Sequence, residues 1–485
     1  MGSISMPPFY MFIALFIALS GFYILLSQAQ NIKQAFFSGL WFGIGYFTTG
    51  LYWAGIPLIT QGKMLWVLLP TLIPVLMFLS LFFALAAVIS YALNYKKLLG
   101  LIVFSLSFTI AGMLLESIIL PWNLFAYSLS FSTEMLQIAS LLGVHGTTFF
   151  VIFCSAAAGV CIQDKATFPC IIALVILVGM FMYGNDRLLK NQEQRYHHDV
   201  ALRLVQGNIK PSWDANQEQE YDTFQTYLRL TSKYGLNSRT HIIWPESSFP
   251  FLTDENYTSV QNTLKFIIPR FLIAGGTRFE NDKFYNTLFA TNSNGEIIDY
   301  YDKCHLLPFG EFIPSILKNI VPTTITNKLN LSHGENKTKL ISLNNKNPFI
   351  PLICYESVFS NEVINRSTGG QWIVNITNDS WFGISSQPYQ HFEISRLRSI
   401  ENGVPTIRVA NSGISGIIDS YGRVIDSLPI MIEGTIDSYL PYHISEGTIY
   451  TRYLKKFINV PFVLLLMLVF LLIRVVLSKY KSHRY

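Results

Sequence analysis

Four long stretches of the chain contain no Asp, Glu, Lys or Arg: residues 34–62, 64–95, 98–115 and 135–163. A helix needs roughly 20 consecutive apolar residues to cross the hydrocarbon core of a bilayer. Only 13% of the residues are charged, whereas about a quarter are charged in an ordinary soluble domain. The runs therefore predict a multi-span α-helical membrane protein and exclude a soluble protein with a few buried helices.

The apolar runs predict seven transmembrane helices. Six lie in an N-terminal membrane domain, residues 1–185, and the seventh follows much later in the chain. The first run has no basic segment before it and no clear cleavage site, which favours a retained helix over a signal peptide. The predicted spans are residues 8–27, 35–57, 66–93, 98–119, 140–163, 167–185 and 457–478.

Basic residues in short loops set the orientation of such a protein, because they stay on the cytoplasmic side. Lys63 is the only basic residue in the short loops that face the other way. This asymmetry places the polar segment 186–456 outside the cytoplasmic membrane. The net charge of +5 is too small and too scattered to suggest a nucleic-acid partner. The predicted cytoplasmic side collects Lys33, Lys96, Lys97, Lys165, Lys479, Lys481 and Arg484.

Residues 199–445, after a linker at 186–198, have a different texture. Short apolar runs that end in polar or turn residues alternate with helical stretches, as in an α/β domain. "NSNGE" and "SYGR" are typical of hairpin turns, and "HFEISRLRSIENG" predicts a helix that ends at a glycine. The predicted strands are "VALRLVQGNI", "HIIWPES", "RFLIAGGTRF", "FIPLICYES" and "QWIVNITNDS".

Three motifs at predicted strand ends carry possible chemistry. "IIWPESS" contains Glu246, "YYDKCHLLPFGEF" contains Lys303 and Glu311, and "ICYES" contains Cys354. Each is weak alone, since such a glutamate usually caps a helix or is solvated, such a lysine usually faces solvent, and such a cysteine is usually inert. Active groups of α/β domains nevertheless gather at strand ends.

Together the three motifs supply what acyl transfer through a thioester needs. A thiol attacks well only after it loses its proton, which Glu246 could accept. Attack on a carbonyl creates an oxyanion, which the Lys303 ammonium and the backbone N–H of Tyr355 could stabilise. The same carboxylate would then deprotonate the incoming amine or water.

The five cysteines fall into two groups. Cys154, Cys161 and Cys170 lie in or beside predicted spans, where we expect them to pack as small apolar residues. Cys304 and Cys354 lie in the polar segment, where we expect free thiols and not a disulfide. The sequence has no phosphate-cradling glycine loop and no His/Cys metal cluster, so we expect neither a metal nor another cofactor.

The ordered motifs "WPES", "YDK…LLPFGE", "ICYE" and "NITNDSWFG" resemble the nitrilase, or carbon–nitrogen hydrolase, superfamily. With the flanking spans, the chain resembles specifically the bacterial apolipoprotein N-acyltransferase family. That resemblance implies a four-layer α-β-β-α sandwich for the nitrilase-like domain. It also implies a two-step reaction in the bacterial cell inner membrane, with the catalytic domain in the periplasm. An acyl chain passes from a phospholipid, usually phosphatidylethanolamine, to the cysteine, and then to the N-terminal amine of a diacylglyceryl apolipoprotein.

The resemblance also implies roles for individual residues. Glu246 would be the general base, Lys303 the oxyanion group and Cys354 the nucleophile. Supporting or substrate-binding positions would be Glu311, Tyr355, Glu356, Trp213, Asn286 and Asn378. Trp213 stands closer to "QGN" than in the family, and Asn286 and Asn378 have the alternative of bonding their own loops. The family has eight spans, whereas seven are predicted here, and Cys304 receives no role.

Two alternatives use the same residues. A membrane-anchored amidase or nitrilase would transfer the acyl group to water, but it would not need seven spans. A lipid-binding scaffold would not need all three reactive residue types. Residues 115–128 lie where the fourth span leaves the bilayer, and Glu116 there is either functional or, as we favour, a carboxylate reaching the membrane interface. Trp122 and Tyr127 are typical of an interfacial aromatic belt.

Overall fold

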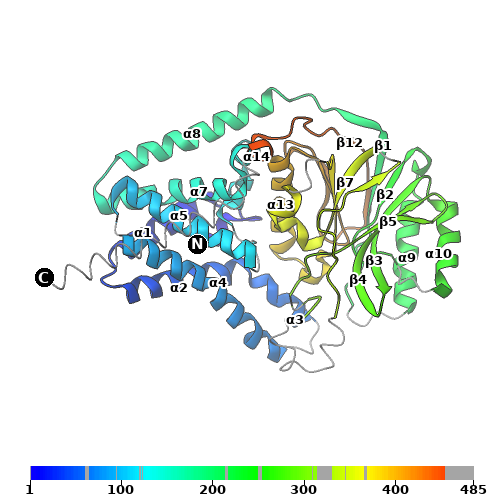
Figure 1. Ribbon diagram of the computed structural model, residues 1–485, viewed down its shortest axis with the longest axis horizontal. Coiled ribbons are helices and arrows are strands. Elements are labelled where there is room, and N and C mark those ends of the chain that lie inside the picture. Colours follow the sequence, from blue (N-terminus) through cyan, green and yellow to red (C-terminus); the bar gives the residue numbers. More distant parts are fainter. Residues whose placement is uncertain are drawn as a thin grey trace. The chain divides into compact units, whose positions relative to one another are not determined.

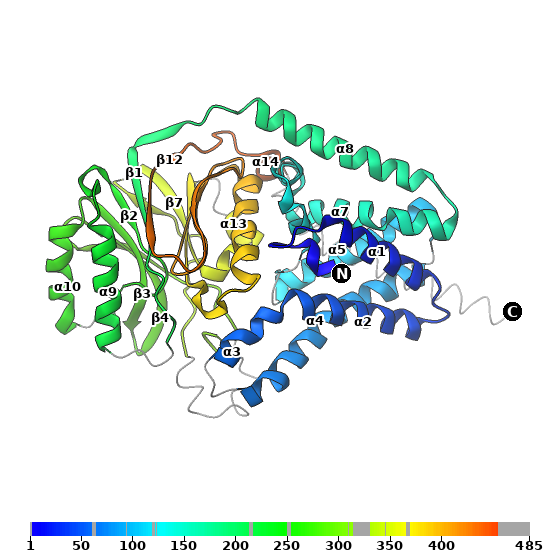
Figure 2. The same ribbon diagram turned by 180° about the vertical axis from the view of Figure 1, so that it is seen from behind.

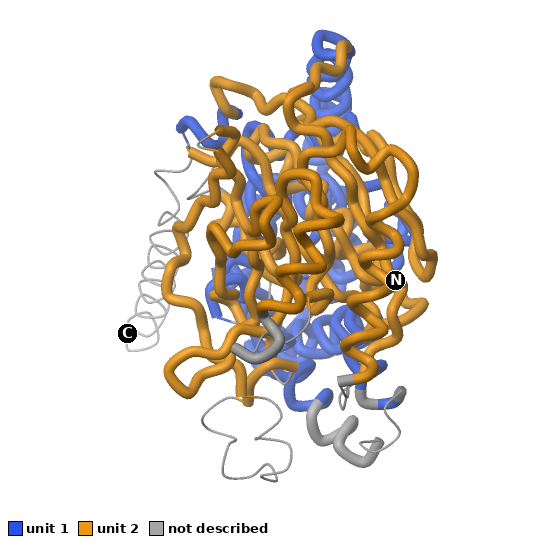
Figure 3. Tube along the Cα trace, turned by 90° about the vertical axis from the view of Figure 1, so that its right-hand side faces the viewer, with its two compact units in different colours: residues 1–192, 448–485 blue, residues 193–447 orange. Residues whose placement is uncertain are grey.

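The computed structural model describes two compact units of the chain. One comprises residues 1–192 and 448–485, and the other residues 193–447 (Figure 3). The described residues are 2–60, 65–93, 95–118, 122, 124–212, 217–249, 254–308, 310–313, 330–344, 346–364 and 369–453.

The first unit is helical. In its described part, four helical segments are long and apolar enough to cross a membrane: Leu72–Leu93, Lys97–Ile118, Ala139–Asp164 and Phe168–Leu189. The helix over the first predicted span is shorter, with 16 residues, and the predicted span 457–478 lies outside the described residues. The helices are α1 (Phe12–Ser27), α2 (Ile32–Gly50), α3 (Ile56–Thr60), α4 (Leu65–Leu93), α5 (Lys97–Ile118), α6 (Thr133–Leu136), α7 (Ala139–Asp164), α8 (Phe168–Leu189) and α14 (Ile449–Tyr453).

Polar groups of this unit lie deeper than the sequence suggested. Glu116, at the end of α5, is 5% exposed and bonds the Nε2 atom of His145 on α7. The prediction that Glu116 reaches the interface was therefore wrong, because a histidine on the neighbouring helix partners it inside the unit. Trp122 and Tyr127 are buried as well, and Trp122 packs against Trp53, so neither belongs to an exposed aromatic belt.

The cysteines of this unit differ from the expectation in one respect. Cys154 is free and buried, as predicted. Cys161 and Cys170 are joined in a disulfide, so they do not pack as separate apolar residues. The two positions lie on α7 and α8, whose short connection brings their Cα atoms to 6.5 Å, within the range that a disulfide spans.

The second unit contains two six-stranded sheets. The first has the order β12-β1-β2-β3-β4-β5 and the second β11-β10-β9-β8-β7-β6. Strands β1, β2 and β3 run parallel, as do β7, β8 and β9. The strands are β1 (Tyr196–Gln206), β2 (His241–Ile243), β3 (Phe271–Glu280), β4 (Lys283–Asn292), β5 (Ile297–Asp302), β6 (Ile341–Leu343), β7 (Lys346–Ile353), β8 (Trp372–Thr377), β9 (Thr406–Ala410), β10 (Ser415–Ile418), β11 (Val424–Leu428) and β12 (Gly434–Pro441).

The two sheets form the middle of a four-layer sandwich. Their facing sides share one apolar core, in which Leu204 and Ile273 of the first sheet pack with Ile353 and Ile376 of the second. Helices α9 (Gln217–Thr231) and α10 (Asp254–Ile267) cover the outer face of the first sheet. Helices α12 (Ser360–Ile364) and α13 (Gln387–Asn402) belong to the other outer layer, and Figures 1 and 2 show α13 on the opposite side from α9 and α10. The predicted α-β-β-α sandwich is confirmed.

Each predicted strand lies in one of these sheets. The predicted helix with a glycine stop is the C-terminal part of α13, which ends at Gly403 in the left-handed conformation that glycine adopts readily. "NSNGE" connects β4 to β5 and "SYGR" connects β10 to β11, as predicted. Helix α8 continues to Leu189, and β1 begins at Tyr196.

Four strands end next to the motifs singled out above. Within the first sheet, β2 leads into Glu246 and β5 leads into Lys303. Within the second, β7 leads into Cys354 and β8 leads into Asn378. The N–H of Asn378 donates to Oε2 of Glu246 at 2.8 Å, so the strand ends of the two sheets meet.

Gly275 on β3 allows this meeting, because the chain that carries Glu246 lies directly against it. A Cβ atom on Gly275 would lie 2.6 Å from the Cα of Glu246 and 2.9 Å from the carbonyl oxygen of Pro245. The amide groups of Ser248 and Phe249 also donate to the Gly275 carbonyl. A side chain at this position would have to displace backbone.

We therefore expect Gly275→Ala to destabilise the second unit by about 1–3 kcal/mol, the usual cost of overpacking. Gly434→Ala is the matched control, because the added Cβ would meet the end of the Leu428 side chain, no closer than 3.1 Å. Thermal unfolding of the purified protein in detergent measures both. Equal unfolding temperatures for the two variants would contradict the proposed steric role.

Candidate active site at the strand ends

Lys303 is the centre of a buried charge cluster. It follows β5, is 2% exposed, and places Nζ 2.9 Å from the Glu311 carboxylate and 3.3 Å from Oε1 of Glu246. Burial alone would lower the pKa of this ammonium, but the charges of Glu311 and Glu246 outweigh burial and hold the pKa well above its ordinary value. Lys303 is therefore a cation held inside the domain.

Asn286 on β4 holds the two carboxylates in place. Its Nδ2 atom donates to Oε1 of Glu246 and to Oε1 of Glu311, both at 2.7 Å. The second oxygen of each carboxylate accepts a backbone N–H: Leu307 donates to Glu311 at 2.7 Å, and Asn378 donates to Glu246 at 2.8 Å. Every carboxylate oxygen of the cluster has a donor, so both side chains are fixed in orientation.

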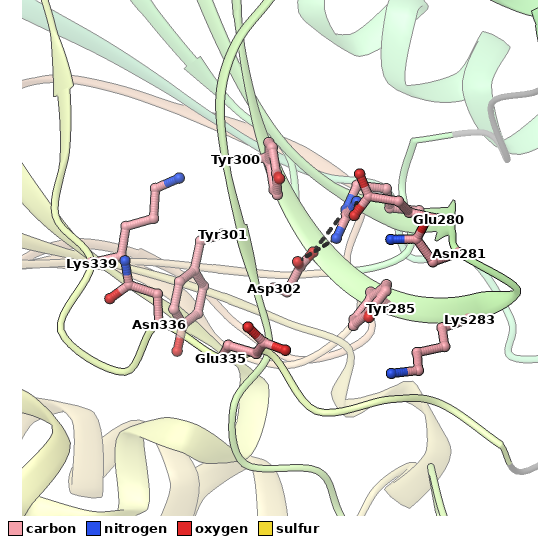
Figure 4. A pocket seen from close by; sticks show the side chains of 11 residues that line it. Glu280, Asn281, Lys283, Tyr285, Tyr300, Tyr301, Asp302, Glu335, Asn336 and Lys339 are labelled. Atoms are coloured by element: carbon pink, nitrogen blue, oxygen red, sulfur yellow. Dashed lines mark hydrogen bonds and ion pairs between the residues drawn. The ribbon is translucent and has the colours of Figure 1, made fainter.

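The end of β5 is anchored on its other side by Asp302. The carboxylate accepts two bonds from the Arg278 guanidinium, at 3.1 and 2.6 Å, and one from the Thr287 hydroxyl at 2.6 Å. Arg278 and Asp302 line an open polar hollow of about 390 Å³, and Figure 4 shows Asp302 among the other side chains that line it. Cys354 does not line the hollow. The clamp on Asp302 fixes the backbone from which Lys303 extends.

Cys354 begins a short 3-10 turn, η6 (Cys354–Val358), directly after β7. Its φ of +51° lies in the left-handed region, which is costly for a residue with a side chain and typical of functional turns. Burial raises the pKa of the thiol, the charge of Glu246 raises it further, and the charge of Lys303 opposes both. The thiol is therefore protonated at rest, within electrostatic reach of a carboxylate and an ammonium.

Glu356 ties the turn after β7 to the loop after β5. The side chain is completely buried. Its Oε1 atom accepts bonds from the Tyr301 hydroxyl at 2.9 Å and from the N–H of Cys304 at 2.7 Å, and its Oε2 atom accepts from the N–H of Ile353 at 2.8 Å. This carboxylate therefore holds two site loops together.

The remaining predicted positions have varied surroundings. Tyr355 is buried and its ring packs against Phe359, with centroids 5.1 Å apart. The Asn378 side-chain oxygen accepts a bond from Ser380 in its own loop, the alternative open to it, and another from Asn411 at 3.1 Å. The backbone N–H of Asn378 donates to Glu246. Trp213 lies outside the described residues.

Two family models match the chain. The model described as "Apolipoprotein N-acyltransferase N-terminal domain" matches residues 1–157, and the one described as "Carbon-nitrogen hydrolase" matches residues 201–441. A relative from Rhodopseudomonas palustris named "Apolipoprotein N-acyltransferase" is 32% identical over 451 residues, 88% of this chain and 83% of the relative. One from Rickettsia typhi with the same name is 32% identical over 470 residues, 92% of each chain.

The chain belongs to the apolipoprotein N-acyltransferase family. It is accordingly an acyltransferase within the carbon–nitrogen hydrolase superfamily, and its family implies lipid substrates and a membrane setting. Among solved structures, an amidase of the nitrilase superfamily from Nesterenkonia AN1 matches with a TM-score of 0.40 at 17% identity, covering 55% of this chain and 98% of the amidase. The resemblance drawn from the sequence motifs is confirmed at the level of family and enzyme class.

Sequence reasoning missed a second buried polar group beneath Cys354. Asp379, on η7 (Asp379–Phe382), bonds His391 of α13 at 3.0 Å and Arg408 of β9 at 2.7 Å, and all three side chains are completely buried. The motif "NITNDSWFG" contains Asp379, but the pattern of α13 gave no sign that its polar residues face inward.

The charge cluster around Lys303 predicts how the stability of the folded protein depends on pH. Because the folded pKa of Lys303 lies above the unfolded value of about 10.4, the stability that its partners contribute is complete below that pH. This stability is lost only as the pH rises through the folded pKa. Glu311→Gln removes one of the two carboxylate charges and so lowers the folded pKa of Lys303. We therefore expect the stability contribution to be smaller, and its loss above the unfolded pKa to be complete at a lower pH. At pH 7.5 we expect a cost of about 1.5–3 kcal/mol, typical of a hydrogen bond to a charged group.

The measurement is the apparent unfolding temperature of the purified protein in detergent between pH 7.5 and 12. Below about pH 10 we expect flat profiles, with that of Glu311→Gln lower than that of the wild type, and above the unfolded pKa of about 10.4 we expect a smaller fall for Glu311→Gln than for the wild type. Glu280→Gln is the control, because Glu280 is a half-exposed partner of Arg278 and exposed pairs contribute little. Identical pH profiles for Glu311→Gln and the wild type would show that Glu311 does not hold the charge of Lys303.

Proposed function

We propose that the protein transfers an acyl chain from a phospholipid to the N-terminal amine of a diacylglyceryl apolipoprotein, through a thioester on Cys354. The carrying observation is the buried cluster of Lys303, Glu246 and Glu311 at the strand ends beside Cys354. Family membership supports the reaction class. Phosphatidylethanolamine is the donor and a diacylglyceryl apolipoprotein the acceptor that we propose; the relatives' printed name, "Apolipoprotein N-acyltransferase", supports an apolipoprotein as the class of acceptor.

The first step forms the thioester. As Sγ of Cys354 attacks the ester carbonyl, Glu246 accepts the thiol proton; a base is needed because the thiol is protonated at rest. The oxyanion is stabilised by the Lys303 ammonium and the N–H of Tyr355. When the carbon–oxygen bond of the ester breaks, Glu246 returns the proton to the departing lysophospholipid alcohol.

The second step uses the same groups in reverse order. Glu246 accepts a proton from the acceptor amine as its nitrogen attacks the thioester carbonyl, and the oxyanion again forms beside Lys303. The carbon–sulfur bond then breaks, and the Cys354 thiolate recovers a proton from Glu246. Glu311 and Asn286 take no proton; they keep Lys303 charged and Glu246 oriented.

We further propose the domain division expected from the sequence. Residues 1–185 form the membrane domain, 186–198 the linker, 199–445 the catalytic domain, and 457–478 a closing span. The catalytic domain faces the periplasm of a bacterial cell inner membrane. The distribution of lysine and arginine in the short loops supports this orientation, and the membrane-capable helices support the multi-pass arrangement.

The decisive experiment follows the acyl group. Purified protein is incubated with phosphatidylethanolamine labelled in its acyl chain, and mass spectrometry detects a hydroxylamine-labile adduct on Cys354. We expect Cys354→Ala to form no adduct, and Lys303→Met to form it more slowly by a factor of about 10²–10³, the usual loss for one oxyanion donor. A diacylglyceryl peptide added afterwards should take up the label.

Two controls match these variants. Cys154→Ala removes another free cysteine, and Lys339→Met removes a lysine that is paired with Asp299; both should behave as the wild type. Release of the label as free fatty acid, with none on the peptide, would favour the membrane-anchored amidase alternative. Peptide acylation by Cys354→Ala at a comparable rate would rule out the thioester.

Topology is tested separately. Alkaline phosphatase is active only after export, so a fusion in the 186–198 linker should be active. A fusion after Tyr485 should be inactive, as should one in the short loop before Lys97, which is the matched control within the membrane domain. The reverse pattern would place the catalytic domain in the cytoplasm.

A further inference from the structure

The peptide group between Cys354 and Tyr355 links the backbone of the nucleophile to one of the proposed oxyanion donors. A peptide group is planar, so its carbonyl oxygen and its N–H point in opposite directions. Whatever holds the Cys354 carbonyl therefore also sets the direction of the Tyr355 N–H. The left-handed φ of Cys354, +51°, costs free energy and persists only where the surroundings enforce it.

The Cys354 carbonyl lies among three buried polar side chains. Its oxygen is 3.2 Å from Nδ2 of Asn375, 3.1 Å from Nε2 of His391, and 3.3 Å from Oγ of Ser357. The three come from β8, α13 and the turn η6 itself. Each is at most 1% exposed, so none of them can touch a substrate.

These side chains belong to a closed set of contacts, which we call the buried ring: Ser357, Asn375, Asp379, His391 and Arg408. Nδ1 of His391 is 3.0 Å from Oδ1 of Asp379, and Oδ2 of Asp379 accepts a bond from Arg408 at 2.7 Å. Arg408 also donates to Oδ1 of Asn375. The ring runs from one side of the Cys354 carbonyl to the other.

The charges in the buried ring determine which of its atoms carry protons. Burial opposes ionisation of Asp379, but His391 and Arg408 hold the pKa of this carboxyl well below its usual range. Burial and the Arg408 charge lower the pKa of His391, although Asp379 acts in the opposite direction. The neutral imidazole therefore carries its proton on Nδ1, facing Asp379. Nε2 is left to accept the Ser357 hydroxyl at 3.1 Å. With the one Ser357 proton directed at Nε2, the Asn375 amide is the donor that bonds the Cys354 carbonyl.

We propose that His391 is a positioning residue, which pins the Cys354 turn through Ser357 so that the Tyr355 N–H points at the oxyanion. Ser357 is the third residue after Cys354 in the same turn, and Asn375 holds the carbonyl from the other side. The inference rests on the proposed function, in which the Tyr355 N–H is an oxyanion donor. It adds a buried histidine that acts on the reaction without touching the substrate.

Two reactions of the same thiol separate this role from a general structural one. Acylation of Cys354 by p-nitrophenyl butyrate passes through an oxyanion and needs its donors. Alkylation by iodoacetamide is displacement at a saturated carbon and forms no oxyanion. The ratio of the two rates therefore reports the oxyanion donors, whereas loss of the thiol's exposure or of the fold would lower both rates together.

Two substitutions at His391 each replace a different contact of its side chain. An asparagine amide can replace Nδ1 at Asp379 but does not extend to Ser357, whereas a glutamine amide extends to the place of Nε2. We expect His391→Asn to lower the acylation-to-alkylation ratio by roughly 10–100-fold, less than the loss of a whole donor. We expect His391→Gln to recover part of that loss. Ser357→Ala should lower the ratio in the same way and tests the idea even if a His391 variant fails to fold.

His241→Asn is the matched control, since His241 is a buried histidine on β2 whose ring bonds Thr240. Its ratio should equal that of the wild type. A wild-type ratio in both His391→Asn and Ser357→Ala, or an equal fall of both rates, would overturn the positioning role. Because the butyrate ester requires no phospholipid, failure of the phospholipid reaction in the wild type would count against the proposed function alone.

Discussion

The buried ammonium of Lys303 is the interaction on which the site depends. An unpaired charge inside a protein is too costly to persist, and a paired one is tolerated only with good geometry and further hydrogen bonds. Glu246 and Glu311 provide the pairing, and Asn286 and two backbone amides complete their bonds. The charge therefore requires segments from both sheets to meet at one point, and Gly275 leaves the room for them to do so.

The same cluster sets the state of Cys354. The two ionised partners act on the thiol in opposite directions, with Glu246 raising its pKa and Lys303 lowering it, while burial adds to the effect of Glu246. A thiol that is protonated at rest is protected from unwanted reaction. In the proposed mechanism it becomes a nucleophile only when an ester carbonyl is present and Glu246 can accept the proton during attack.

Four carboxylates of the second unit have different surroundings, which their positions in the sequence do not reveal. Glu246 and Glu311 face an ammonium, Glu356 accepts backbone amides and a tyrosine hydroxyl, and Asp379 lies between an arginine and a histidine. In the proposed mechanism Glu246 moves a proton. Glu311 keeps Lys303 charged, Glu356 holds two loops together, and Asp379 helps to fix the peptide plane after Cys354. Burial and hydrogen-bond partners decide the difference.

The sequence by itself determined that the N-terminal part carries helices able to cross a membrane, four of them in the described residues, because uncharged runs are local patterns. Strand-end motifs are local patterns too, and they determined the α/β character of residues 199–445 and the family. The sequence also singled out Glu246, Lys303, Glu311 and Cys354 as chemistry-bearing residues. Only the tertiary structure decided that Asn286 bridges the carboxylates, that Glu116 meets His145 inside the helical unit, and that His391 lies beneath Cys354. Those facts depend on which faces of distant elements pack together, and α13 buries polar residues such as His391 and Ser395; one sequence read along its length carries no signal for that.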